Sequence, residues 1–130
     1  MDAERLKRIP VFADLGEQAL SQIAALAAEV SVPAGKELVR EGDYSYDVLA
    51  IEEGTARVDR HGEHIADLGP GDVFGEMGVL KREQRNATVV ATSPMLLATL
   101  TSWDVRRLRK TAPKAVEHLR EVVAQRSDQA

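Results

Sequence analysis

The chain has 130 residues, enough for one ordinary domain but too few for two separate hydrophobic cores. Hydrophobic residues make up 44% and charged residues 29%, which excludes a disordered or fibrous protein. The lack of Cys excludes a disulfide scaffold, and a net charge of −4 argues against a general binder of nucleic-acid backbones. No secretory signal and no apolar run of about 18 residues is visible. We therefore expect a single cytoplasmic domain over residues 1–130 that contacts neither membrane nor DNA.

The N-terminal part is predicted to be helical over residues 1–29. Residues 3–8 are typical of a short helix that Pro10 ends, because proline restricts the residue before it. Apolar residues then recur at spacings of three and four, which predicts one face of a second helix. That face contains Leu15, Ala19, Leu20, Ile23, Leu26, Ala27 and Val30.

Residues 30–101 have a different pattern, in which short β-type runs alternate with glycine turns. The runs are residues 37–40, 48–51, 55–60, 63–68, 87–91 and 96–101. Short strands separated by regular turns indicate a small antiparallel barrel or sandwich. The fold class is thus mainly β, with flanking helices.

Two C-terminal helices are predicted over residues 102–126. Thr101 or Ser102 can cap the first helix, and Pro113 suits the start of the second. We expect Trp103, Val105 and Leu108 to form the apolar face of the first helix.

The second C-terminal helix has an apolar stripe of about three turns, too short for a strong coiled-coil seam. The stripe is Val116, Leu119, Val122 and Val123. We therefore expect a monomer or a weak homodimer. Residues 103–126 carry an excess of Lys and Arg, which indicates a solvated helix face or, alternatively, a dock for an acidic partner.

The most informative stretch is the predicted cassette over residues 71–88. Gly71, Gly75 and Gly78 lie close together before a possible helical turn at residues 76–80. Glycine exposes backbone N–H groups to a ligand, and a helix start adds partial positive charge, so this pattern suits a phosphate. Arg85 could complete the cradle with two parallel hydrogen bonds, and Glu76 could accept from a ribose hydroxyl. The alternative is a glycine corner with a surface Arg–Glu pair.

Residues 74–80, followed by Arg85-Asn86-Ala87, closely resemble the phosphate-binding cassette of cyclic nucleotide-binding domains. Residues 11–15 and the turns at 33–35, 40–43, 53–54 and 70–72 match the family in order. The resemblance implies an antiparallel β-roll, jelly-roll-like and built as a double-stranded β-helix. It also implies a non-enzymatic regulatory module whose ligand is a cyclic nucleotide.

The resemblance implies a role for each cassette residue. Gly75 would donate its N–H to the cyclic phosphate, Glu76 would accept from the ribose 2′-OH, and Arg85 would pair with the exocyclic oxygens. Backbone N–H groups of Asn86 and Ala87 would assist. The complete predicted ligand-binding set is Phe74, Gly75, Glu76, Met77, Gly78, Arg85, Asn86, Ala87, Val58, Ile65, Leu68 and Val73. The last four fall where relatives line the pocket, although each is also suited to ordinary barrel core.

The sequence departs from the family pattern at two places, of which the second concerns selectivity. Residues 82–84 are Arg-Glu-Gln where relatives often have Gly-x-Pro before the arginine. Asn86 replaces the usual Ala, Ser or Thr, of which Thr is associated with a preference for cGMP. We therefore expect cAMP as the ligand, with cGMP as the alternative, and no cofactor.

The remaining motifs do not indicate chemistry. His61 and His64 flank Gly62, but a tight turn should make them diverge, so we expect no metal site. No nucleophile–base set is present, which argues against an enzyme.

The predicted function is a sensor that relays binding through its C-terminal helices to an effector protein or domain. The alternative is an interaction or scaffold domain that keeps the fold without responding to nucleotide.

Overall fold

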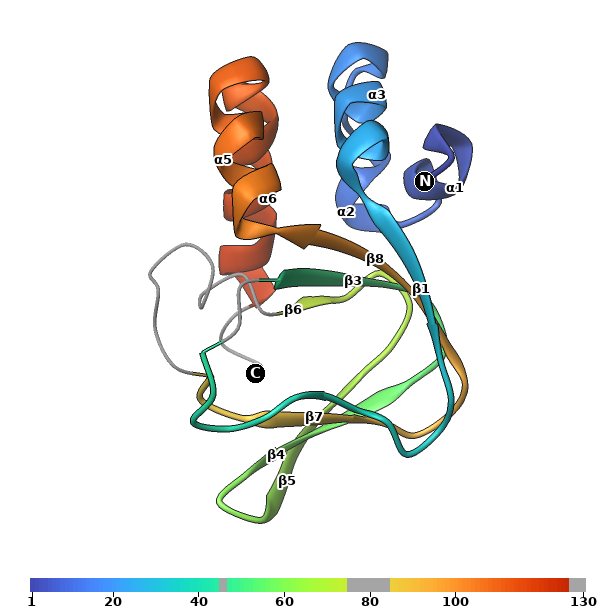
Figure 1. Cartoon of the computed structure of the whole chain (residues 1–130), viewed down its shortest axis with the longest axis vertical. Coiled ribbons are helices and arrows are strands. Elements are labelled where there is room, and N and C mark those ends of the chain that lie inside the picture. Colours follow the sequence, from blue (N-terminus) through green and yellow to red (C-terminus); the bar gives the residue numbers. More distant parts are fainter. Residues whose placement is uncertain (45–46, 75–84, 127–130) are drawn as a thin grey trace.

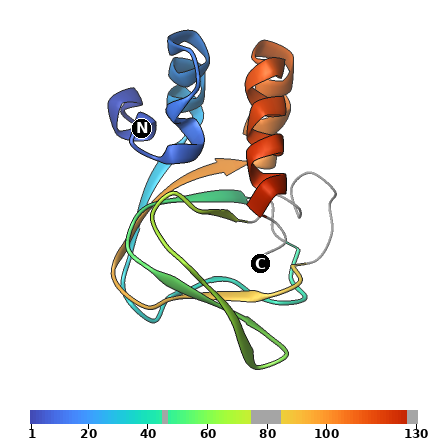
Figure 2. The same cartoon turned by 180° about the vertical axis from the view of Figure 1, so that it is seen from behind.

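The computed structural model of the chain describes residues 1–44, 47–74 and 85–126. Two four-stranded antiparallel sheets form a roll, and helices from both ends of the chain stand together on one side of it (Figure 1). The view from behind shows the same helical layer above the same sheets (Figure 2). The predicted fold class, a mainly β antiparallel roll with flanking helices, is confirmed.

Three N-terminal helices precede the roll: α1 (Ala3–Lys7), α2 (Pro10–Ala13) and α3 (Glu17–Leu26). Asp2 caps α1 by accepting a hydrogen bond from the Glu4 N–H. Pro10 does more than end the first helix. It occupies the first position of α2, where a backbone N–H would have no acceptor within the helix, so proline loses no hydrogen bond there.

The predicted second helix extended too far. It ends at Leu26, and Ala28–Val32 forms β1, a strand that the sequence did not reveal. From Ala28 onward the chain pairs with β8 (Met95–Thr101), and Val32 is buried in the roll. Val30 therefore belongs to a strand, because pairing with β8 overrides the helical spacing of a few apolar residues.

The first sheet has the order β1-β8-β3-β6 and the second the order β2-β7-β4-β5. The strands not yet given are β2 (Glu37–Val39), β3 (Asp47–Glu53), β4 (Ala56–Arg60), β5 (Glu63–Leu68), β6 (Val73–Phe74) and β7 (Thr88–Ala91). All six predicted strands are present, with small differences at their ends. In addition to β1, the prediction missed β6, because its two residues are too few to show the alternation of a strand.

Strand β3, which lies inside the first sheet, is buried on both of its faces. Along β3, Leu49 and Ile51 point into the roll, whereas Ala50 between them packs against the helices. The roll core is the set Val32, Val39, Leu49, Ile51, Ala56, Val58, Phe74, Ala87, Val89, Ala91, Met95 and Leu97. The helical core is the set Leu6, Ile9, Phe12, Leu20, Ile23, Ala24, Ala27, Ala50, Ala98, Leu100, Leu108, Ala115 and Val116.

The C-terminal helices α5 (Ser102–Thr111) and α6 (Pro113–Arg126) are both present as predicted. Thr101 is the last residue of β8 and also the N-cap of α5, where it forms a capping box with Asp104. Strand and helix therefore follow each other without a connecting loop.

The prediction that Trp103 belongs to the apolar face of α5 is wrong. Its side chain is 74% exposed, whereas Leu108 is buried in the helical core. Five residues separate the two, and at about 100° per residue they lie roughly 140° apart around the helix. The helix cannot bury both against the same neighbours.

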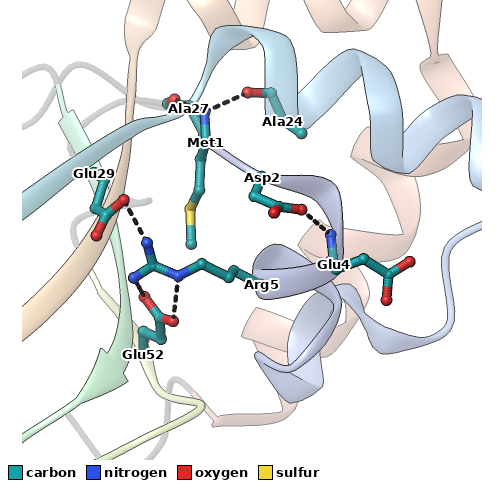
Figure 3. A network of polar contacts seen from close by, with 8 residues as sticks. All are labelled: Met1, Asp2, Glu4, Arg5, Ala24, Ala27, Glu29 and Glu52. Atoms are coloured by element: carbon teal, nitrogen blue, oxygen red, sulfur yellow. Dashed lines mark hydrogen bonds and ion pairs between the residues drawn. The ribbon is translucent and has the colours of Figure 1, made fainter.

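One guanidinium fastens α1 to the first sheet, as Figure 3 shows. Arg5 donates through Nε and Nη2 to the two carboxylate oxygens of Glu52 on β3, at 3.1 and 2.8 Å. Its Nη1 donates to Glu29 on β1 at 2.6 Å. These hydrogen bonds, first to Glu52 and then to Glu29, raise the pKa of Arg5 above its usual value. The N-terminal amine of Met1 donates to the carbonyl oxygens of Ala24 and Ala27, so α1 is also tied to the end of α3.

Candidate functional site

The predicted cassette is described in part. Gly75, Glu76, Met77, Gly78 and residues 82–84 lie outside the described residues. The described members fall on both sides of this segment: Phe74 ends β6, and Arg85, Asn86 and Ala87 lead into β7. The structure therefore describes the two flanks of the site.

The flank before the cassette is a turn that is bonded to β3. The Gly71 N–H donates to the Ile51 carbonyl at 2.8 Å, and the Ile51 N–H donates to the Asp72 carbonyl at 2.9 Å. The Asp72 carboxylate closes the turn by accepting from the Gly69 N–H at 2.8 Å. Gly71 has φ of +92°, a conformation that favours glycine. This turn directs Phe74 into the roll core.

The flank after the cassette is bonded to the turn that follows β2. The Gly42 N–H donates to the Arg85 carbonyl, and the Arg85 N–H donates to the Asp43 carbonyl, each at 2.8 Å. The Glu41 N–H donates to Thr88 Oγ1 at 3.0 Å. Because both backbone groups of Arg85 are held, the start of its side chain has a fixed position.

The Arg85 side chain is buried, with an exposed fraction of 7% for the residue. Its Nη2 donates to the backbone carbonyl of Asp47 on β3 at 2.8 Å. Among the residues whose burial the structure describes, it is the only buried charged residue. Burying a charge is costly unless it is paired and hydrogen-bonded. An arginine that is held in this way is typical of a site that recognises an anion.

The β4–β5 hairpin reaches the same region through two contacts. Arg60 donates through Nε to the carbonyl of Asn86 at 3.0 Å, and the Asn86 side chain is exposed. Glu41 accepts from the His61 N–H at 2.9 Å and lies 3.0 Å from His61 Nδ1. The hairpin tip is thus joined to the residue after Arg85 and to the turn that holds Arg85.

The predicted apolar lining does not gather on one surface. Val58 and Leu68 belong to the roll core or pack against it, as do Phe74 and Ala87. Val73 instead packs against the helical core, on the other face of the first sheet.

Ile65 is set apart from the other predicted lining residues by an irregularity in its strand pairing. It is 40% exposed and lies where the pairing of β4 with β5 shifts from Ala66 to His64. Such a bulge turns a side chain away from the regular alternation.

Sequence reasoning missed the Asp47 carbonyl as a partner of Arg85, and missed Glu41 and Arg60 as residues that contact the segment just after Arg85. Glu41 lay within a turn that was matched to the family, but nothing in the pattern connected it with a histidine far along the chain. The contact of Arg60 depends on the pairing of β4 with β7, and the Asp47 contact uses a backbone oxygen that any residue carries. No local signal could have found these contacts.

The two hairpin histidines pair with different carboxylates, as the divergence argument predicted. His61 lies beside Glu41, and His64 Nε2 lies 2.8 Å from Asp67 Oδ1. Within residues 1–44, 47–74 and 85–126, no group of three His, Asp or Glu side chains is placed to hold a metal ion. In the same ranges, no helix is both long and apolar enough to cross a membrane.

The fold and its buried arginine define a class of protein: a helix-capped antiparallel roll with a buried arginine shortly before one of its strands. Comparison with known families agrees with this class. The family model for the cyclic nucleotide-binding domain matches residues 29–112, which is more than half of the chain. The chain belongs to the cyclic nucleotide-binding domain family. Binding rather than catalysis defines this family, in agreement with the prediction of a non-enzymatic regulatory module.

Several proteins are similar to the chain. A cyclic nucleotide-gated potassium channel from Rhizobium etli is 32% identical over 118 residues, 91% of this chain and 33% of the channel. A cAMP-dependent protein kinase regulatory subunit from Yarrowia lipolytica is 34% identical over 119 residues, 89% of this chain and 31% of the subunit. The chain thus spans about a third of the length of these relatives. Among solved structures, the catabolite activator protein from Thermus thermophilus has a TM-score of 0.81 at 27% identity, over 92% of this chain and 58% of that protein.

Proposed function

We propose that the chain binds cAMP as a regulatory module and that Arg85 pairs with the cyclic phosphate. The observation that carries the proposal is the burial of Arg85, since the residue that the family pattern assigns to phosphate is the buried charge of the described structure. Two hydrogen bonds from a guanidinium to phosphate oxygens are strong and depend on geometry. The bond from Nη2 to the Asp47 carbonyl supports this role by limiting the orientations of the guanidinium.

The other ligand contacts follow from the family resemblance. In the proposal, Gly75 donates a backbone N–H to the phosphate and Glu76 accepts from the ribose 2′-OH. Backbone N–H groups of Asn86 and Ala87 add to the phosphate contacts, and Arg60 steadies Asn86 through its carbonyl. Met77, Gly78 and the apolar residues Val58, Ile65, Leu68 and Val73 complete the proposed surroundings of the nucleotide.

The proposed relay runs through β8 into the C-terminal helices. β8 pairs with β3, which carries the carbonyl that Arg85 contacts, and Thr101 joins β8 directly to α5. A ligand shifts the equilibrium between two arrangements of these helices only to the extent that it binds one arrangement more tightly than the other. The effector would be a separate protein or domain, as the channel and the kinase regulatory subunit among the relatives suggest.

A calorimetric titration with cAMP and with cGMP tests ligand binding and selectivity. We expect cAMP to bind at least as tightly as cGMP, because position 86 lacks the Thr that is associated with cGMP in relatives. Tighter binding of cGMP would contradict the selectivity, and no binding of either would favour the scaffold alternative.

A third titration with 2′-deoxy-cAMP tests the proposed role of Glu76. The analogue should bind the unmodified protein more weakly than cAMP. Glu76→Gln should weaken the binding of cAMP clearly but the binding of the analogue only slightly. The reason is that the analogue lacks the hydroxyl group from which Glu76 would accept a hydrogen bond.

A further inference from the structure

Helix α5 presents an exposed stripe of one aromatic and three basic side chains. The stripe consists of Trp103, Arg106, Arg107 and Lys110, spaced at three, four and seven residues from its first member. This spacing places the four side chains on one side of a helix. The opposite side carries Leu108, which is buried, and Val105, which packs against the helical core. The α5 stripe therefore faces away from the domain, and all four of its residues are exposed.

The aromatic end of the α5 stripe is organised for contact. Trp103 is 74% exposed, the highest value among the large hydrophobic residues of the described structure. The Arg106 guanidinium lies over its ring, 5.3 Å from the centroid. This cation–π contact holds a positive charge beside an apolar surface. Trp and Arg are also the residues that most often dominate binding energy at protein interfaces.

The charge of the α5 stripe differs in sign from the rest of the molecule. Helix α5 holds four basic residues and one acidic residue, Asp104, which is engaged in the capping box. Residues 1–102 hold ten basic and seventeen acidic residues. Helix α5 is therefore a locally basic region, whose field is screened beyond about one Debye length of roughly 10 Å. An extended polyanion such as a bilayer or a nucleic-acid duplex would also meet the acidic remainder, whereas a short acidic segment would not.

We propose that the α5 stripe docks a short acidic segment of a partner protein. Carboxylates of the segment pair with Arg106, Arg107 and Lys110, and an apolar side chain packs on Trp103. The stripe includes none of the residues around Arg85, so its docking can be measured without nucleotide.

The test uses the full chain and a short labelled peptide that is rich in Glu and Asp and contains two Leu. Trp103 is the only tryptophan, so its emission reports on the stripe directly. We expect the peptide to shift this emission and to raise its own fluorescence anisotropy, and we expect added salt to weaken both effects. A matched peptide with Gln and Asn in place of Glu and Asp should bind at least about tenfold more weakly, the factor that corresponds to about 1.4 kcal/mol.

Variants assign the binding to the stripe. Arg107→Glu should weaken peptide binding about tenfold or more, since like charges then oppose each other. Trp103→Ala should also weaken it when anisotropy is measured. The control is Lys36→Glu, an exposed residue in the turn before β2 that undergoes the same change of charge. It should leave peptide affinity unchanged.

Three results would overturn the proposal. The first is no binding at about 1 mM peptide, which corresponds to about −4 kcal/mol. The second is an equal loss of affinity in Lys36→Glu and Arg107→Glu, which would indicate a response to net charge alone. The third is tighter binding of the chain to phosphatidylserine vesicles or duplex DNA than to the peptide, lost in Arg107→Glu. Because cAMP titration is a separate measurement, failure of the docking proposal is distinguishable from failure of the ligand assignment.

Discussion

Arg85 serves both the proposed ligand and the fold. Its backbone bonds to Gly42 and Asp43, and its side chain is buried and donates to the Asp47 carbonyl. The family resemblance assigns this side chain to the ligand rather than to the core, so we expect the domain to remain folded without it. The burial adds a loss of stability to this expectation, because removing a buried side chain also removes its packing and its hydrogen bond.

The residue-level prediction is that Arg85→Ala weakens cAMP binding by roughly thirtyfold to several thousandfold. The reason is that truncating one partner of a buried charge pair costs about 2–5 kcal/mol, and each decade of affinity is about 1.4 kcal/mol. Calorimetric titration measures the loss.

Two further measurements accompany the Arg85→Ala titration. Arg85→Lys should restore only part of the affinity, because an ammonium cannot reproduce the guanidinium fork. Circular dichroism should show that each variant is folded at the titration temperature, although less stable than the unmodified protein. Unchanged cAMP affinity in folded Arg85→Ala would remove the assignment of Arg85 to the phosphate.

At the level of elements, the turn between β3 and β4 depends on one glycine. Gly54 has φ of +96°, and a Cβ built on it would lie 2.8 Å from Met95 Cγ and would also collide with the Pro94 carbonyl oxygen. Gly35 has a similar φ of +88° but has no atom within 4 Å of such a Cβ. Substitution at Gly35 therefore introduces backbone strain alone, whereas substitution at Gly54 introduces the same strain and a steric collision.

We expect Gly35→Ala to lower the free energy of unfolding by about 1–2 kcal/mol, the cost of a left-handed conformation with a Cβ. Gly54→Ala should cost about 1–3 kcal/mol more, because the methyl group also overpacks against β8. Urea denaturation of both variants measures the difference. Equal losses in the two variants would show that the turn relaxes away from Pro94 and Met95.

The sequence revealed the elements with strong local signals and missed those that depend on distant partners. Short β-type runs separated by glycine turns predicted the roll, and Thr101 and Pro113 predicted the starts of the C-terminal helices. Strand β1 was read as helix because Val30 continued a spacing of three and four, and only its pairing with β8 decides the matter. The cassette motif identified Arg85 but could not show its burial, since that depends on β3 and the turn after β2 lying beside it.

At the scale of the whole molecule, Arg5 joins the helical layer to the roll by contacts with two strands. We expect Arg5→Ala to lower the thermal unfolding midpoint, because Glu52 and Glu29 then lose their shared partner. The midpoint of Arg5→Lys should lie between those of Arg5→Ala and the unmodified protein, since one ammonium cannot bind both oxygens of Glu52 and also reach Glu29. The control is Arg40→Ala, which removes an exposed pair with Glu37 and should leave the midpoint unchanged. Equal midpoints for Arg5→Ala and Arg40→Ala would contradict the role of Arg5.

The assembly prediction is that the chain is a monomer or a weak, concentration-dependent dimer. Ala115 and Val116 on α6 are already buried in the helical core of the same chain. They are therefore not available to a partner helix, which shortens any coiled-coil seam. Sedimentation measures the state, and a stable dimer at nanomolar concentration would contradict the prediction.

Strand β5 has a consequence for behaviour in concentrated solution. It ends the second sheet, so one side of its backbone is not paired within that sheet. Edge strands of this kind can recruit another molecule and start aggregation. Here the strand carries Glu63, His64 and Asp67, all exposed, and the shifted pairing near Ile65 interrupts its regular geometry. Charge and irregularity together disfavour edge-to-edge growth, which should help the chain stay dispersed even though its net charge is only −4.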